Sequence, residues 1–83
     1  MDINKNTISF PFSESDMALR ATYNVDGNLE YLGRARPGAA ESAAEWQISK
    51  TAYDASGRVT SVKFAAGTNA YTKVWNDRAT YSY

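Results

Sequence analysis

Several short groups of residues have the types and spacing that other proteins use for chemistry. The first is Asn24-Val25-Asp26-Gly27-Asn28, in which oxygen-bearing side chains flank a glycine and resemble part of a calcium-binding loop. An EF-hand loop places its ligands at alternate positions, its glycine at the sixth and a bidentate Glu at the twelfth. This segment is too short for that pattern and its glycine is misplaced. Turn formation therefore explains these residues better than metal binding.

A second group, Tyr31 with Arg34 and Arg36, combines an aromatic ring with two cations, as in surfaces that stack single-stranded nucleic acid. However, Glu30 lies directly beside Tyr31, and nine basic residues are balanced by nine acidic ones. Zero net charge provides no electrostatic attraction to a phosphate backbone. The sequence therefore predicts an ordinary solvated strand face, with the two arginines as polar contacts and no nucleic-acid partner.

The composition excludes most catalytic chemistry. The chain contains no Cys and no His, which removes disulfides, thiolate or imidazole zinc sites, and Ser-His or Cys-His relays. Its 83 residues leave little room for both a scaffold and a sheltered pocket. We therefore expect a protein that is not an enzyme and that uses no cofactor or metal.

The sequence also lacks membrane and export patterns. No apolar run approaches the roughly 20 residues of a membrane span, and the N-terminus lacks the basic and then apolar layout of a secretory signal. We expect synthesis in the cytoplasm and no membrane partner.

The predicted core is thin. Leu, Ile, Val and Phe together number only 13 of 83 residues, whereas the aromatic residues number 11. Chains of about 70–80 residues or fewer seldom obtain more than ~3–5 kcal/mol from one core, and small proteins often add stability by association. This composition predicts association with copies of the same chain or with a larger assembly.

Two similar turns organise the chain. The segments 23–29 and 53–59 each contain a Tyr, then Asn or Asp, a Gly four residues after the Tyr, and an aliphatic residue two positions later. This spacing predicts a type I turn followed by a left-handed glycine that forms a bulge. The turn-forming residues are Asn24 and Gly27 in the first turn, and Asp54 and Gly57 in the second. Each turn joins antiparallel strands, so we predict hairpins over 17–34 and 46–65.

The remaining segments are predicted from weaker patterns. Residues 1–12 are predicted to form an N-terminal arm or a short edge strand over 7–12. The edge position is expected because Pro11 cannot donate into a central ladder. Residues 35–45 are predicted to form a mobile loop that a partner orders. In the tail, Tyr71, Val74 and Trp75 favour a helix over 69–77, with a strand as the alternative, followed by a final strand over 79–83.

Together these elements predict one α+β, β-rich domain over 1–83. Its small antiparallel sheet contains the two bulged-turn hairpins and an edge strand, and a short helix follows near the C-terminus.

An ordered series of residues resembles a known group of proteins. The series comprises Trp46-Gln47-Ile48, Tyr53-Asp54 with Gly57, Val59-Thr60-Ser61, Phe64-Ala65 with Gly67, and Val74-Trp75 with Arg78-Ala79 and Tyr81. With the 23–32 hairpin and Gly38-Ala39, it covers about three quarters of the chain. It resembles small, mostly uncharacterised proteins of tailed bacteriophages. The resemblance implies a phage origin and a place in the virion, and it carries no catalytic or ligand residues.

A single segment, 53–60, is also similar to the tyrosine-aspartate repeats of large secreted toxins and shell proteins. Those repeats need many tandem copies to bury their faces. The chain contains one good copy and one partial copy, which indicates shared hairpin chemistry.

These observations predict a non-enzymatic structural protein of the virion, synthesised in the host cytoplasm. It would pack in several copies against other head, neck or tail proteins. The alternative is a phage module that recognises a host-surface glycan or a host protein. The candidate core or interface residues are Trp46, Trp75, Tyr71, Tyr81, Tyr83, Arg34 and Arg36.

Overall fold

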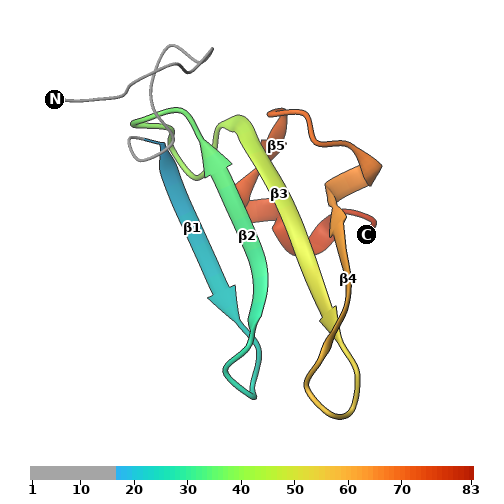
Figure 1. Ribbon diagram of the computed structural model, residues 1–83. Helices are drawn as coiled ribbons and strands as arrows, with labels where there is room; N and C mark the ends of the chain where they lie inside the picture. The colour runs from blue at the N-terminus through green and yellow to red at the C-terminus, as the bar shows by residue number, and fades with distance from the viewer. Residues whose placement is uncertain (1–16) are drawn as a thin grey trace, which may run out of the picture.

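The computed structural model describes residues 17–83, which form an antiparallel sheet. Its main strands follow the order β1-β2-β3-β4, so each pairs with its neighbour in sequence (Figure 1). The strands are β1 (Ala18–Tyr23), β2 (Leu29–Ala35), β3 (Ala44–Tyr53) and β4 (Val59–Phe64). The predicted β-rich class with two hairpins is confirmed. The predicted arm and edge strand at 1–12 lie outside the described residues.

Both predicted turns are present and use the same hydrogen bonds. The Gly27 amide donates to the Asn24 carbonyl at 2.9 Å, and the Gly57 amide donates to the Asp54 carbonyl at 3.0 Å. The two glycines have φ values of +85° and +83°, which glycine adopts at little cost. The Asn24 and Asp54 side chains each accept the amides two and four residues further along. The strand register shifts beside each turn, as a bulge requires.

The strand register divides the sheet into two faces. Gly33 on β2 is opposite Ile48 on β3, and Leu32 is opposite Ser49. Because opposed residues in an antiparallel pair point the same way and successive residues alternate, these two pairs lie on different faces. We name them the covered face, with Gly33 and Ile48, and the open face, with Leu32 and Ser49.

The C-terminal segment packs on the covered face. It contains a short 3-10 turn η3 (Ala65–Gly67), strand β5 (Lys73–Val74) and 3-10 helix η4 (Trp75–Thr80). β5 pairs antiparallel with the beginning of β3. In Figure 1, η4 lies behind the half of the sheet that is farther from the two turns.

The predicted short C-terminal helix is present as η4, but the tail differs from its prediction in two details. The predicted helix over 69–77 gives way to β5, because residues 73–74 pair with β3, and the helical segment begins only at Trp75. The predicted strand over 79–83 does not form, since Ala79 and Thr80 belong to η4 and the last residues are irregular.

The loop between β2 and β3 is bound to its own domain. Ala39 is buried in the core, and the indole Nε1 of Trp46 donates to the Ala40 carbonyl at 2.9 Å. Glu41 pairs with Arg20 on β1 at 2.6 Å, and its carbonyl accepts the Asn76 amide at 3.1 Å. These contacts hold the loop against its own domain, whereas the sequence predicts a mobile loop.

Candidate functional site

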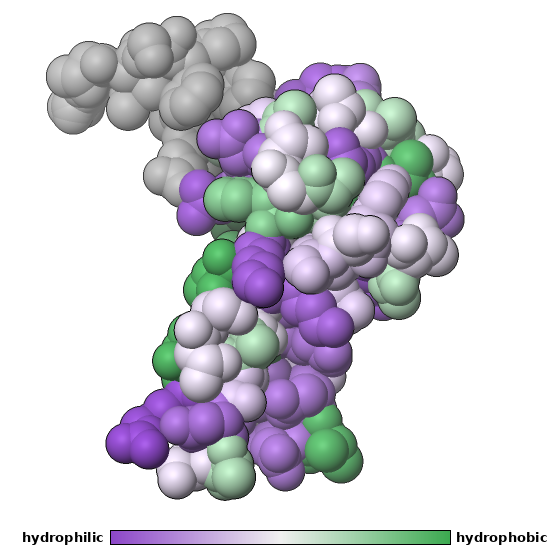
Figure 2. Space-filling model, turned by 90° about the vertical axis from the view of Figure 1, so that its right-hand side faces the viewer, coloured by the Kyte–Doolittle hydropathy of each residue, from purple (hydrophilic) through white to green (hydrophobic). Residues whose placement is uncertain are grey.

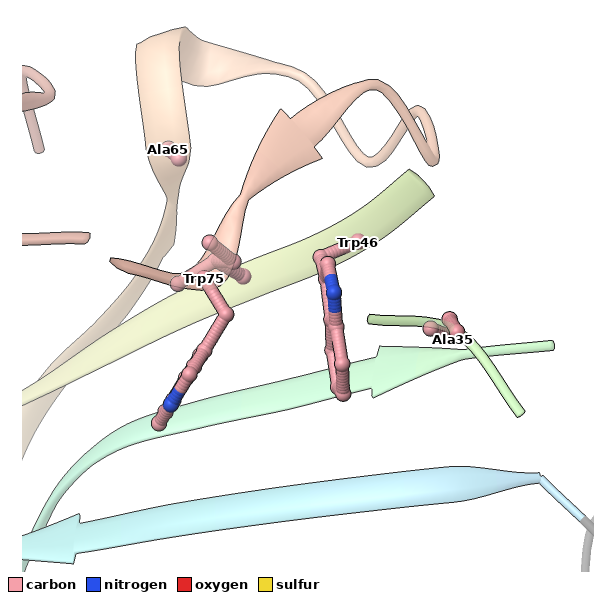
Figure 3. Close-up of a cluster of buried hydrophobic side chains, with 6 residues drawn as sticks. Ala35, Trp46, Ala65 and Trp75 are labelled. Carbon is pink, nitrogen blue, oxygen red and sulfur yellow. The ribbon is translucent and has the colours of Figure 1, made fainter. Parts of the chain in front are cut away.

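Two tryptophans form the centre of the covered face. Trp46 comes from β3 and is fully buried, whereas Trp75 begins η4 and is 4% exposed. Their ring centroids are 5.9 Å apart with an interplanar angle of 39°. Figure 3 shows both rings side by side and directed toward β2. The pair joins the C-terminal segment to the sheet, so both residues belong to the core.

A glycine on β2 makes room for this pair. A Cβ atom at Gly33 would lie 2.6 Å from Cε3 of Trp75 and 3.1 Å from Cε3 of Trp46. These separations are shorter than the roughly 3.5–4.0 Å of carbon atoms in contact. Gly33 does not have a positive φ, so its role is to let the indole rings approach the strand.

The C-terminal tyrosines extend the same cluster. The Tyr81 hydroxyl accepts the Val74 amide at 2.8 Å, and the Tyr83 hydroxyl donates to the Arg78 carbonyl at 2.7 Å. The Tyr83 ring meets Tyr31 edge-on at 5.7 Å. Burial, with a smaller contribution from the neighbouring tyrosines, raises the pKa of the Tyr83 hydroxyl to about 12. Both C-terminal tyrosines are half-buried and hydrogen-bonded within the chain.

Cationic side chains lie over these rings. The Arg78 guanidinium lies 4.7 Å from the ring centroid of Trp75, and that of Arg20 lies 5.6 Å from Trp46. Such contacts contribute about 0.5–1 kcal/mol at exposed positions. Because its polar atoms are largely bonded internally, this half of the covered face stabilises the fold and leaves little for a ligand to bind.

The other candidate residues lie outside the tryptophan pair. Tyr71 is exposed in the segment before β5. Arg34 is half-buried on the open face, opposite Gln47 of β3. Arg36 is exposed at the start of the loop and pairs with Glu45 at 3.1 Å. The structure therefore brings together four of the predicted aromatics and separates Tyr71 and both arginines from them.

Exposed apolar side chains are concentrated on the outer strands. Two are on β1, Leu19 and Tyr23, and three are on β4, Val59, Val62 and Phe64; their exposed fractions run from 37% to 64%. Figure 2 shows the molecule from the β4 side, with hydrophobic residues reaching the surface among polar ones. Exposed apolar clusters are typical of surfaces that contact other macromolecules.

Within residues 17–83, no group of three or more acidic side chains is placed to hold a metal ion. That part of the chain also contains no helix long and apolar enough to cross a membrane. Comparison of the chain with protein families, curated proteins and solved structures finds no match.

Three residues that no sequence pattern marks are prominent in the structure. No local pattern marks Gly33, because its partners Trp46 and Trp75 are 13 and 42 positions away in sequence. Lys50 and Lys63 are directly opposite each other on β3 and β4. The 54–57 turn and its bulge fix the register of this hairpin, and that register places the two lysines opposite each other.

Proposed function

We propose that this protein is a non-enzymatic structural component of a tailed-bacteriophage virion, present in several copies and packed against other particle proteins. The observation that supports a packing role is the set of exposed apolar side chains on β1 and β4. The phage assignment rests on the sequence resemblance.

The strand edges provide the means of contact. β1 and β4 end the four-strand order, so among the described residues no further strand pairs with the outer edge of either. Soluble proteins usually protect such edges with charges, prolines or bulges, because an unpaired edge is a template for another strand. In this chain, large exposed apolar residues lie on both of these outer strands. We expect edge pairing combined with burial of these side chains.

Charged substitutions test this surface. Val62 on β4 is 57% exposed, whereas Val25, at the tip of the first turn, is 99% exposed. We expect Val62→Lys to abolish concentration-dependent association in sedimentation experiments, and Val25→Lys to behave like the wild-type chain. Equal behaviour of the two variants would show that the outer strand is not the contact surface.

Mass analysis of purified particles tests the virion role directly. A fixed copy number that matches the symmetry of the head or the tail is the expected result. Absence from particles would refute the structural role and favour the alternative, in which the protein recognises a host glycan or a host protein.

A further inference from the structure

A shallow pocket lies beside the aromatic cluster on the covered face. Its lining residues are Lys50, Ala52, Ser61, Lys63 and Tyr83, and its volume is about 160 Å³. The strand pairs are Lys50 with Lys63 and Ala52 with Ser61, so all four strand residues point to this face. The pocket is bordered by Tyr83 of the C-terminal segment on one side and by β3 and β4 beneath it.

Within residues 17–83, neither lysine of the pocket has a carboxylate partner. Arg20, Arg36 and Arg58 each pair with a carboxylate. The Nζ atom of Lys50 lies 5.5 Å and 5.8 Å from the ring centroids of Tyr31 and Tyr83. Within the described residues, the side chain of Lys63 makes no hydrogen bond or ion pair. Like charges directly opposite each other on neighbouring strands destabilise a sheet. An anion bound between the two lysines would therefore reduce their electrostatic repulsion.

We infer that this pocket binds a phosphate monoester group. Such a group carries nearly two negative charges at neutral pH and three strong acceptor oxygens. Lys50 and Lys63 supply two positive charges, and the Ser61 hydroxyl supplies a further donor. The ring of Tyr83 forms an apolar wall for the organic part of the ester. The volume suits a small group of this kind, since pockets for larger ligands are typically about 300 Å³ or more.

This site is independent of the proposed virion role, because it uses the pocket and not the exposed apolar side chains of β1 and β4. Nuclear magnetic resonance titration of the whole chain with inorganic phosphate and with phenyl phosphate tests it, at an ionic strength held constant with sodium chloride. We expect the amide signals of Ser61 and Lys63 to shift saturably with a midpoint of about 1–10 mM, as suits exposed charges. Phenyl phosphate should bind several-fold more tightly than phosphate because its ring contacts Tyr83.

Matched variants separate the pocket from general charge effects. Lys63→Gln should raise the phosphate midpoint at least ten-fold, whereas Lys73→Gln, with the same change in net charge outside the pocket, should leave it unchanged. Without phosphate, Lys63→Gln should raise the melting temperature by about 1–5 °C, because it removes the opposed charge.

Three results would overturn the proposal. They are shifts that do not saturate, equal effects of the two glutamine variants, and a melting temperature that falls in Lys63→Gln. Equal midpoints for phosphate and phenyl phosphate would overturn the role of the Tyr83 wall.

Discussion

The close approach of two tryptophans to β2 makes Gly33→Ala the most informative substitution in this domain. The new methyl group would lie 2.6 Å and 2.8 Å from two ring atoms of Trp75, and 3.1 Å from Trp46. The shortest of these contacts is about 1 Å inside the favoured separation of carbon atoms. The Trp75 ring has little freedom to retreat, because it is 4% exposed, next to Trp46 and beneath Arg78.

The expected change in the free energy of unfolding of Gly33→Ala follows from two opposing effects. Overpacking a filled core destabilises proteins by about 1–3 kcal/mol. Replacing Gly by Ala at an ordinary backbone conformation recovers about 0.4–1 kcal/mol by restricting the unfolded chain. We therefore expect a net loss of about 1–2 kcal/mol, which in a domain of this size lowers the melting temperature by roughly 5–15 °C.

Urea unfolding followed by tryptophan fluorescence measures this cost. Because Gly33 touches the only two tryptophans in the chain, the native emission should change together with stability. Gly57→Ala is the matched control. No atom lies within 4 Å of its new Cβ, but φ is +83°, so it should lose about 1 kcal/mol through backbone strain without altering the native emission.

A double-mutant cycle identifies the source of the clash. In a Trp75→Leu background, the cost of Gly33→Ala should fall by at least 0.5 kcal/mol, as expected for residues in contact. The reasoning is refuted if Gly33→Ala retains wild-type stability and emission, or if its cost is the same in both backgrounds.

Two further predictions concern the hairpins. Hydrogen bonds, above all from the Arg58 amide, lower the pKa of Asp54 from its ordinary value of 3.8. The Asp54 carboxylate therefore stabilises the second turn above pH 3.8, and this stabilisation is lost as the pH falls through the lower pKa of the folded state. The Arg58 amide signal should therefore titrate below pH 3.8, whereas the equivalent amide beside Asn24 should not; equal titration of the two would contradict this. Tyr53→Phe removes a 2.6 Å hydrogen bond from the hydroxyl to the Leu29 carbonyl and should cost about 1 kcal/mol in urea unfolding. An unchanged unfolding midpoint would show that water replaces this bond without loss.

The sequence by itself determined the two hairpins. Their turns depend on interactions within five residues, namely a side-chain acceptor at Asn24 or Asp54 and a glycine with positive φ. Because these interactions are local, they can be predicted from the amino-acid sequence alone. Alternation of apolar and polar residues then placed the flanking strands within one or two positions of their observed bounds.

Only the tertiary structure decided the tail and the two sites that depend on it. Residues 69–77 have helical spacing, but pairing of β5 with β3 takes precedence, and η4 starts where Trp75 enters the space above Gly33. The opposed lysines come from different strands, and the Tyr83 wall of their pocket comes from a third segment. These features arise from contacts between residues distant in sequence, which local patterns do not encode.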